Sequence, residues 1–245
     1  MLDNLKTVFI TGTDTGVGKS IFTVFLALSY LGRGKKIAIV KPLQTGLPKD
    51  TDFLKALIED KIPFFNTYSF LLPAAPRIAS KHENKTIDVK KIISDIKELE
   101  NQFDHVIVEG IGGIAVPITD CGTDVLPCND VYLVADLIKD LNYPVIVVAR
   151  PSLGTINHTV LTIELAKQKG LHVLGFVISG YDERTNDTVI KTAPDAISDI
   201  TKIKCLIKIP YIREITYDSI CSVTREVLSS SNTPNVRAKA YPINL

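Results

Sequence analysis

The sequence is poor in cysteine and histidine, and the few that it has are not arranged as metal ligands or disulfide partners. Its four cysteines are Cys121, Cys128, Cys205 and Cys221, and none of them forms a CxxC pair. We therefore expect reduced thiols, and neither a zinc site nor a disulfide framework. The four histidines are scattered along the chain as well, so we expect no metal cluster built from side-chain nitrogen and sulfur.

Excess charge and long hydrophobic runs are also missing. The 28 lysines and arginines nearly balance the 27 acidic residues, and the net charge of +1 argues against nucleic-acid or membrane binding through bulk positive charge. No apolar run has the length of a membrane span, and the apolar residues before Gly12 are too few for a signal sequence. With 45% apolar and 22% charged residues, we expect an ordinary globular, cytoplasmic chain with neither a nucleic-acid nor a membrane partner.

Short runs rich in valine, isoleucine and leucine recur along the chain, separated by stretches long enough for a helix. They predict strands at Thr7–Thr11, Lys36–Lys41, His105–Glu109, Pro144–Ala149, His172–Ser179 and Cys205–Ile209. Runs that are nearly continuous in apolar residues are typical of parallel sheets covered on both faces. The stretches between them predict helices at Lys19–Leu31, Asp52–Glu59, Val89–Asn101, Asp130–Leu141, Ile156–Lys169 and Asn186–Ile200.

This alternation predicts an α/β fold, with a mostly parallel central sheet flanked by helices and built from βαβ units. No internal repeat and no domain linker is visible, so we expect a single domain over residues 1–228. After Leu228 the composition shifts to the turn formers Ser-Ser-Ser-Asn-Thr-Pro-Asn. The tail 229–245 is therefore expected either to be loosely ordered or to pack over one edge of the sheet.

A glycine-rich segment, Gly12-Thr13-Asp14-Thr15-Gly16-Val17-Gly18-Lys19-Ser20, joins the first predicted strand to the first predicted helix. The backbone N–H groups of such a turn bind phosphate oxygens, and the helix dipole favours negative charge there. Lys19 brings a cation to the outer phosphates, and the Ser20 hydroxyl can bind Mg²⁺. The segment is one residue longer than the common motif, because Thr13 stands at the usual first glycine. We predict a nucleotide-binding phosphate loop, and hence a fold of the phosphate-loop NTPase type, over a chance glycine-rich turn.

Polar residues end the next two predicted strands, where ligands bind in open α/β sheets. Lys41 brings a cation to this edge, although alone it is better explained as a solvated strand end. Glu109 ends an apolar strand, which is the pattern that holds Mg²⁺ in phosphate-loop enzymes, although Asp is usual there. The alternative for Glu109 is a tight turn with an exposed carboxylate. The glycines of Gly110–Gly113 let the backbone approach a ligand closely.

Two predicted helix starts leave a structural and a functional interpretation open. Asp52 is either a metal ligand or only an N-cap, and Asp50 competes for the metal role. The segment Thr155-Ile156-Asn157 begins a helix whose free N–H groups suit a carboxylate or a phosphate. Ordinary capping by Thr155 explains that segment about equally well.

Together these loops resemble those of the dethiobiotin synthetase family over roughly residues 5–212. The matching pieces are Gly-Thr-Asp-Thr-Gly-Val-Gly-Lys-Ser, Lys-Pro-Leu-Gln-Thr-Gly, Val-Glu-Gly-Ile-Gly-Gly with Val116-Pro117, and Leu-Gly-Thr-Ile-Asn-His-Thr with Leu161-Thr162. Members of that family close the ureido ring of dethiobiotin from diaminopelargonic acid, CO₂ or bicarbonate, and ATP. The resemblance implies this activity, with ATP and Mg²⁺ as cofactors and a homodimer as the assembly.

The resemblance also implies roles for individual residues. It implies ATP contacts at Thr13, Asp14, Thr15, Gly16, Val17, Gly18, Lys19, Ser20, Ser179 and Pro210. It implies Mg²⁺ ligands at Ser20, Asp52 and Glu109, and catalytic roles for Lys19 at the phosphates and for Lys41 at the carbamate and the transferred phosphate. It implies substrate contacts at Thr45, Glu109, Gly110, Gly112, Thr155, Ile156 and Asn157, of which the last three would reach the carboxylate from the partner subunit.

Three positions depart from the family pattern. Ile111 stands where alanine is usual, and it is expected to crowd the substrate side. Ser179 stands where some members have an asparagine that contacts adenine. The segment Leu206–Pro210 lacks the glycine that usually precedes its Ile-Pro pair.

Two rival functions use the same fold. A switch ATPase of the partition and cell-division type would bind a protein partner or a membrane, but such proteins usually carry an extra lysine early in the phosphate loop, where this chain has Thr13-Asp14-Thr15. An amidating ligase of the cobyrinate type normally carries a long glutaminase extension, for which this chain has no room.

Overall fold

The computed structural model describes residues 5–47, 50–59, 61–120 and 131–230. Its central sheet has seven strands in the order β11-β10-β9-β1-β6-β2-β4, and every neighbouring pair is parallel. The strands are β1 (Thr7–Gly12), β2 (Ile37–Val40), β4 (Phe64–Phe65), β6 (His105–Gly113), β9 (Val145–Ala149), β10 (Val173–Tyr181) and β11 (Cys205–Pro210). The α/β fold predicted from the sequence is therefore confirmed.

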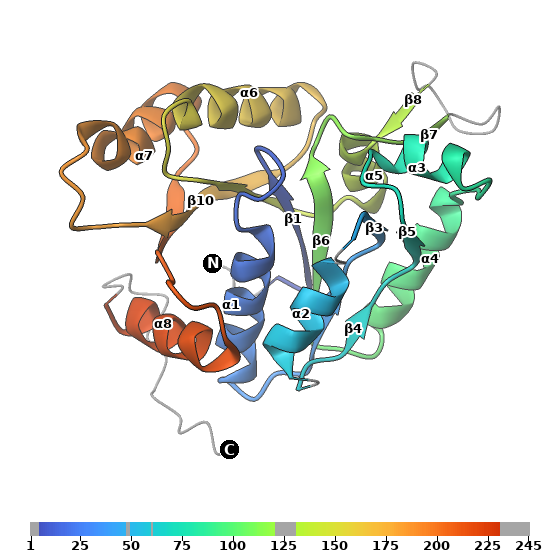
Figure 1. Cartoon of the computed structure of the whole chain (residues 1–245), viewed down its shortest axis with the longest axis horizontal. Coiled ribbons are helices and arrows are strands. Elements are labelled where there is room, and N and C mark those ends of the chain that lie inside the picture. The colour runs from blue at the N-terminus through green and yellow to red at the C-terminus, as the bar shows by residue number, and fades with distance from the viewer. Residues whose placement is uncertain (1–4, 48–49, 60, 121–130, 231–245) are drawn as a thin grey trace.

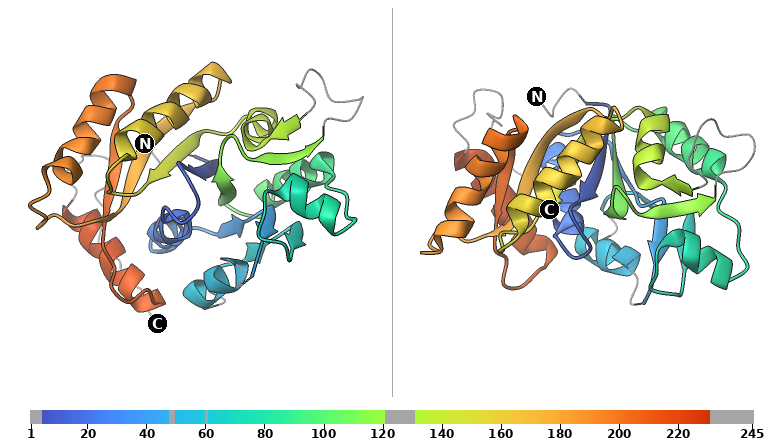
Figure 2. Two further views of the ribbon diagram at one scale, coloured as in Figure 1. Left: turned by 45° about the horizontal axis from the view of Figure 1, so that its top comes forward. Right: turned by 90° about the horizontal axis from the view of Figure 1, so that it is seen from above.

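Helices cover both faces of the sheet (Figures 1 and 2). They are α1 (Lys19–Leu31), α2 (Asp50–Ile58), α3 (Pro76–His82), α4 (Val89–Glu100), α5 (Val134–Leu141), α6 (Thr155–Gln168), α7 (Thr188–Thr201) and α8 (Tyr217–Ser230). Successive residues of β1 point to opposite cores: Val8 and Ile10 pack with α1, α2 and α8, whereas Phe9 packs with the helices of the other face. This burial on both faces explains why the strands are nearly continuous in apolar residues.

Two small sheets extend the strand ends beyond the main sheet. β3 (Leu43–Thr45) pairs with β5 (Tyr68–Phe70), and β7 (Pro117–Asp120) pairs with β8 (Val131–Leu133). The sequence patterns did not predict these strands, nor the two-residue edge strand β4, nor helices α3 and α8. Each missed strand is only two to four residues long, so its apolar pattern is too short to stand out.

Three predicted helix starts are wrong by two residues or more. Helix α7 begins at Thr188 rather than Asn186, because the Asp187 carboxylate accepts the N–H of Val189 and caps the helix there. The helix expected from Asp130 begins at Val134, because the Asp136 carboxylate accepts the N–H of Leu133 at 2.9 Å and so caps the first turn there; Asp130 itself lies outside the described residues. Helix α2 begins at Asp50 rather than Asp52, so the interpretation of Asp52 as an N-cap is also wrong.

The C-terminal helix α8 packs against α1 and extends past Leu228 to Ser230. The tail was expected over residues 229–245, and its part from residue 231 onward lies outside the described residues. The domain boundary therefore stays a prediction. Cys121 and Cys128 lie outside them too, while Cys205 and Cys221 are free thiols. No helix in the described ranges combines the length and the apolar character needed to cross a bilayer.

Candidate functional site

The sheet order brings five polar loops together at the carboxyl ends of the strands. β1 lies between β6 and β9, with β2 beyond β6 and β10 beyond β9 (Figure 1). The phosphate loop therefore has Glu109 and Lys41 on one side and Arg150 and Ser179 on the other. Ligands of open α/β sheets bind at this kind of edge.

The predicted phosphate loop ends in a helix start that has no side-chain cap. Gly18 occupies the N-cap position of α1 with φ of 94°, in the left-handed region, and the first turn contains no acidic residue. Glycine adopts this conformation without the steric cost that other residues meet. The start of α1 thus combines a positive dipole end with backbone donors that no side chain caps, as an anion site requires.

Lys19 lies over this loop rather than pointing into solvent. It is 7% exposed, and its Nζ donates to the carbonyl oxygen of Asp14 at 2.9 Å. A Cβ added to Gly12 would lie 3.0 Å from that Nζ and 2.8 Å from Val17. The loop is therefore compact, and Lys19 is held where its ammonium faces the space enclosed by the loop.

The polar centre of the site is a buried cluster of Ser20, Lys41 and Glu109. Nζ of Lys41 lies 2.7 Å from Oε1 of Glu109, with the two side chains only 2% and 0% exposed. The Ser20 hydroxyl donates to the same oxygen at 2.9 Å. Strand pairing explains the contact, because Val40 is in register with Val108, and Lys41 and Glu109 each follow directly.

The other oxygen of Glu109 makes this cluster a fitting place for a cation. Oε2 is buried and has no hydrogen-bond partner within the described part of the chain. A buried carboxylate oxygen without a donor is costly, and oxygen donors such as a carboxylate and a hydroxyl are the ligands that Mg²⁺ prefers. Ser20 and Glu109 therefore fit a divalent metal, which Oε2 would help to hold.

Asp52 is not part of this cluster. Its side chain is exposed on α2, and no hydrogen bond or ion pair described for residues 5–47, 50–59, 61–120 and 131–230 joins it to Ser20 or Glu109. No group of three or more His, Cys, Asp and Glu side chains in those ranges could hold a metal. Thr45 ends β3 and is half-buried, but it likewise makes no described bond to the cluster. The metal role of Asp52 and the substrate role of Thr45 stay predictions.

The glycine-rich end of β6 lies against the phosphate loop. The strand continues past Glu109, which is 0% exposed, so the alternative of a tight turn with an exposed carboxylate is wrong. Gly112 has φ of 56°, and a Cβ there would lie 2.8 Å from Val116 and 3.8 Å from Oγ1 of Thr15. A Cβ on Gly113 would lie 3.1 Å from the carbonyl oxygen of Gly12. Gly110 and Ile111 pack against apolar side chains instead. Gly110 lies on the ring of Phe9, and Ile111 packs against the hydrophobic core.

On the opposite side of the loop, Ser179 touches the start of α1. It is 7% exposed, and its Oγ would lie 2.3 Å from a Cβ on Gly18. Pro210 ends the neighbouring strand β11, in register with Tyr181. Both residues were predicted to contact the nucleotide, and they lie near the ends of adjacent strands. Of the two, Ser179 is the one in contact with the phosphate loop.

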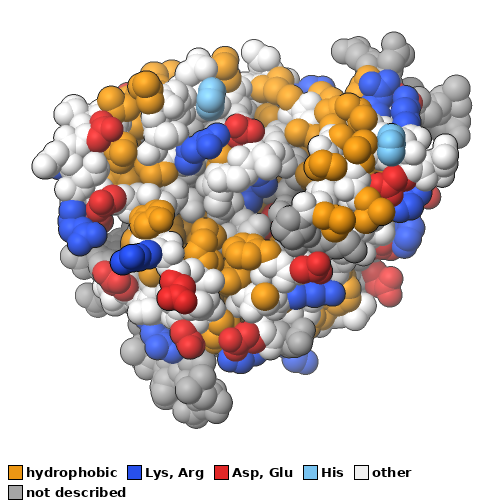
Figure 3. Space-filling model, in the orientation of Figure 1, with side chains coloured by type: hydrophobic (Ala, Val, Ile, Leu, Met, Phe, Trp, Pro, Cys, Tyr) orange, Lys and Arg blue, Asp and Glu red, His pale blue; other side chains and the backbone are white. Residues whose placement is uncertain are grey.

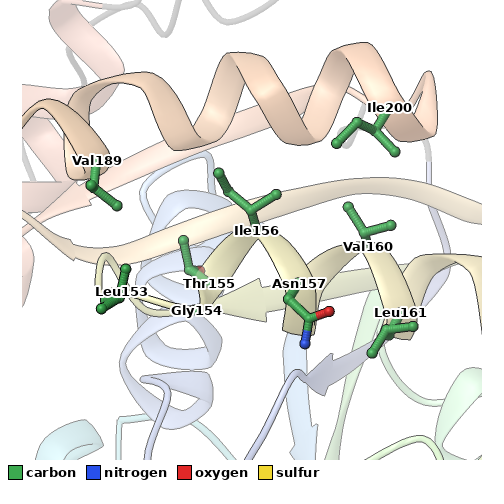
Figure 4. Close-up of a pocket in the computed structure, with 9 residues that line it drawn as sticks. All are labelled: Leu153, Gly154, Thr155, Ile156, Asn157, Val160, Leu161, Val189 and Ile200. Atoms are coloured by element: carbon green, nitrogen blue, oxygen red, sulfur yellow. The ribbon is translucent and has the colours of Figure 1, made fainter.

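Helix α6 begins in the same way as α1. Gly154 is its N-cap with φ of 88°, and no side chain caps it. Thr155 is the first helical residue and is 3% exposed, so the interpretation that Thr155 caps this helix is wrong. Figure 4 shows the surroundings, a cavity of about 480 Å³ whose lining includes Ile156 and Asn157 together with apolar residues of α6 and α7.

Two contributors were missed by sequence reasoning. Arg150, the first residue after β9, lies with one guanidinium nitrogen 3.0 Å from Oδ2 of Asp14 in the phosphate loop. Asn66 donates to the carbonyl oxygen of Lys41 at 2.7 Å and so fixes that strand end. A basic residue directly after a predicted strand was the only local signal for Arg150, and its importance depends on β9 lying beside β1. The role of Asn66 likewise depends on tertiary contacts that no local pattern encodes.

No cysteine in the described ranges is suited to act as a nucleophile at this site. Burial raises the pKa of the Cys205 thiol to about 11, and burial also raises the pKa of Cys221. The thiolate is the reactive form of cysteine. The chemistry of the site therefore comes from its lysines, its carboxylate and its backbone N–H groups.

The comparisons with known proteins agree with this geometry. The family model described as an AAA domain matches residues 6–219. The ATP-dependent dethiobiotin synthetase BioD of Thermodesulfovibrio yellowstonii is 36% identical over 222 residues, covering 86% of this chain and 91% of that protein. The protein of the same name from Bacillus subtilis is 32% identical over 234 residues, covering 93% and 96%.

Solved structures with a similar fold are more distant in sequence. A ParA family ATPase from Chlorobium tepidum has a TM-score of 0.51 at 16% identity, with 94% of this chain and 93% of that chain covered. The MinC:MinD cell division complex of Aquifex aeolicus gives 0.53 at 15% identity, covering 92% and 97%. These similarities show the fold alone. The identities over most of both chains show that this chain belongs to the ATP-dependent dethiobiotin synthetase family.

Proposed function

We propose that this chain is an ATP- and Mg²⁺-dependent ligase that makes dethiobiotin from diaminopelargonic acid and CO₂ in the cytoplasm. Its family membership supports ATP-dependent ligase activity in biotin biosynthesis. The observation that carries the proposal is the buried Lys41–Glu109 pair, at 2.7 Å, beside the uncapped start of α1. This arrangement supplies a cation, a carboxylate and backbone donors at one edge of the sheet, as phosphoryl transfer to a small substrate requires.

The proposed reaction needs no side-chain nucleophile. One amine of the substrate takes up CO₂ as a carbamate, and a carbamate oxygen attacks the γ-phosphorus of ATP, releasing ADP. The second amine then attacks the carbonyl carbon of the mixed anhydride, expels inorganic phosphate and loses a proton, which closes the ring. The protein contributes position and charge.

Each residue of the site has a place in this scheme. Lys19 and the loop N–H groups hold the phosphates, and Lys41 contacts the carbamate oxygen and the transferred phosphate. Ser20 and Glu109, with Asp52 as the third candidate, hold Mg²⁺, which when bound neutralises charge on the phosphate oxygens. Thr45 and the backbone around Gly110 and Gly112 contact the amine end of the substrate. Ser179 and Pro210 border the nucleotide base.

We further propose a homodimer in which each site is completed by the partner. The carboxylate at the far end of the substrate needs its own donors, and the uncapped start of α6, at Thr155, Ile156 and Asn157, lies at the surface of the chain. The N–H groups of Ile156 and Asn157 supply the donors, since the N–H of Thr155 already donates to the Ser152 carbonyl oxygen at 3.0 Å. Apolar side chains surround that start: Leu153 is 88% exposed and Leu161 is 61% exposed. Hydrophobic side chains reach the surface over α6 and α7, at the upper left of Figure 3. An exposed apolar patch of this kind supports burial against a second copy.

One assay separates this function from its rival. ATP hydrolysis and dethiobiotin formation are measured with and without diaminopelargonate and bicarbonate. Stimulation of ADP release by both compounds together, with dethiobiotin formed in equal amount, is expected of the synthetase. Stimulation only by a protein or by lipid vesicles would instead establish a switch ATPase of the partition and cell-division type.

A further inference from the structure

The contacts of Glu109 are unevenly shared between its two oxygens. Oε1 receives both the Lys41 ammonium, at 2.7 Å, and the Ser20 hydroxyl, at 2.9 Å. Oε2 is buried and has no hydrogen-bond partner among the described residues. One oxygen of this carboxylate is therefore crowded with donors while the other is left without one.

The surroundings of Glu109 make an opposing charge necessary. The carboxylate is 0% exposed and borders a cavity of about 10 Å³ lined by apolar side chains that include Phe9, Leu43 and Ile118. A charge in such surroundings must be paired, because solvation by water is lost. In the structure the Lys41 ammonium supplies that opposing charge, 2.7 Å from Oε1.

The two proposed roles of this pair place two cations on one carboxylate. Glu109 and Ser20 are proposed to hold a divalent metal, whose bonds to oxygen are only about 2.1 Å long. Lys41 is proposed to contact the transferred phosphate, yet it is bonded to the same Glu109 oxygen as Ser20. A metal ion and an ammonium on one carboxylate would be like charges a few ångströms apart, and they repel each other.

We propose that the Lys41 ammonium and the divalent metal exchange at Glu109. Without nucleotide, Lys41 occupies the place of the cation; when the metal arrives with the nucleotide, it takes Glu109 and Ser20, and Lys41 turns to the phosphate edge. This inference rests on the proposed function for the destination of Lys41, but the exchange itself concerns only this chain and a divalent ion. Lys41 thus adds its charge to the phosphate edge only after the metal has bound.

The Lys41 side chain is the part that moves in this exchange. Asn66 holds the carbonyl oxygen of Lys41 at 2.7 Å, and β2 fixes the backbone just before it, so the backbone has no need to move. The lysine side chain is flexible and carries its charge at the end of a four-carbon stem. Rotation of that stem alone changes the partner of the ammonium.

The test measures metal binding without nucleotide, using Mn²⁺ and its electron paramagnetic resonance signal to count free ions. The Lys41→Met variant removes the competing ammonium, so Mn²⁺ is expected to bind about tenfold tighter or more than to the unchanged protein. The matched control is Lys19→Met, which removes the same charge from the neighbouring phosphate loop, where Nζ donates to the Asp14 carbonyl oxygen. Its Mn²⁺ affinity is expected to stay within about twofold of the unchanged protein.

Two further variants keep the test decisive. Lys41→Gln is neutral but keeps a donor for Glu109, so it shows the same gain in Mn²⁺ affinity even if Lys41→Met does not fold, as checked by circular dichroism. Adding Glu109→Gln to either Lys41 variant is expected to abolish the gain. The exchange is overturned if both Lys41 variants bind Mn²⁺ no tighter than the unchanged protein, or if Lys19→Met gains as much.

Turnover of the unchanged protein is measured in parallel. Dethiobiotin formation without a gain in Mn²⁺ affinity would refute the exchange and leave the proposed function intact. A gain in Mn²⁺ affinity in a protein that makes no dethiobiotin would support the exchange and refute the proposed function.

Discussion

Helices α1 and α6 start alike and end up in different surroundings. Each follows a glycine in the left-handed region, Gly18 with φ of 94° and Gly154 with φ of 88°, and neither has a side-chain cap or an acidic residue in its first turn. Ten of the 13 residues of α1 are buried, whereas only four of the 14 in α6 are. Helix α1 packs between α8 and α2, whereas α6 lies along one edge of the molecule (Figure 1).

The difference shows which anion site is complete within the chain. Around the start of α1 this chain itself gathers Lys19, Lys41 and Glu109. Around the start of α6 it offers an apolar cavity and exposed leucines instead of charged partners. The same backbone arrangement therefore fits our proposal of a phosphate site completed within one chain at α1 and of one half of a shared site at α6.

The largest expected effect breaks the α1 site. Lys19→Ala removes a charge at the transferred phosphate, and the loss of one preorganised charge typically costs roughly two to three orders of magnitude in rate. We expect at least that loss of turnover at saturating ATP, with circular dichroism showing the fold unchanged. Near-normal turnover would mean that the loop does not hold the reacting phosphate.

The second prediction tests whether the α6 site belongs to the partner. Asn157 is exposed, unlike the buried Thr155, so Asn157→Asp places a negative charge near the substrate carboxylate without disturbing the core. We expect it to inactivate the enzyme, with Asn157→Gln as the neutral control that keeps most activity. Mixing Lys19→Ala with Asn157→Asp leaves one intact site in each mixed dimer, so random re-pairing restores roughly a quarter of wild-type activity.

This mixing result decides between two arrangements. If each site lies within one chain, every site keeps one defect and mixing restores nothing. Light scattering before the assay must show that both variants form and exchange dimers. A monomeric unchanged protein with full activity would also contradict the shared site.

The third prediction, of intermediate size, concerns how strongly the α1 site discriminates between nucleotide bases. Ser179 offers one hydroxyl near the nucleotide, where an asparagine would offer both a donor and an acceptor amide. We expect kcat/KM values for ATP, GTP and CTP to agree within about a hundredfold. A stronger preference for ATP would require paired hydrogen bonds from other residues, and Ser179→Ala, as the control, should leave the ratios nearly unchanged.

The sequence predicted the parts of the fold that are locally encoded. Helix α1 was predicted with its observed bounds, because Gly18 and Gly32 flank a continuous apolar stretch. Helix α8 was missed, although Tyr217, Ile220, Cys221 and Thr224 are buried at helical spacing. The polar residues Asp218, Ser219 and Ser222 between them obscured the pattern. The capping interpretation of Thr155 was wrong because the preceding Gly154 provides the turn.

The site was predictable only as separate loops. Lys41 alone was better explained as a solvated strand end, and the structure instead buries it on Glu109. That contact depends on β2 lying beside β6, which follows from how the strands cross over and not from any local pattern. Arg150 was missed for the same reason, since it matters only because β9 lies beside β1.

The smallest expected effect concerns Arg150, which joins the two regions. It follows β9, comes shortly before the start of α6, and pairs with Asp14 of the loop before α1 at 3.0 Å. Both side chains are about half exposed, at 46% and 54%, and an exposed pair contributes at most about 1 kcal/mol. Arg150→Ala is therefore expected to raise the KM for ATP by no more than about fivefold, with kcat unchanged.

The salt dependence of that effect shows whether the pair acts through its charge. Ions screen exposed charges over about 10 Å at 0.1 M ionic strength, so the difference between Arg150→Ala and the unchanged protein should shrink as salt is added. Arg184→Ala is the matched control, because Arg184 is 94% exposed and lies 3.5 Å from Asp182 on the surface; no change in KM is expected. A fall in kcat of about a hundredfold in Arg150→Ala would show instead that the guanidinium contacts the transferred phosphate. In that case the α1 site would draw one of its charges from the end of the strand that leads into α6.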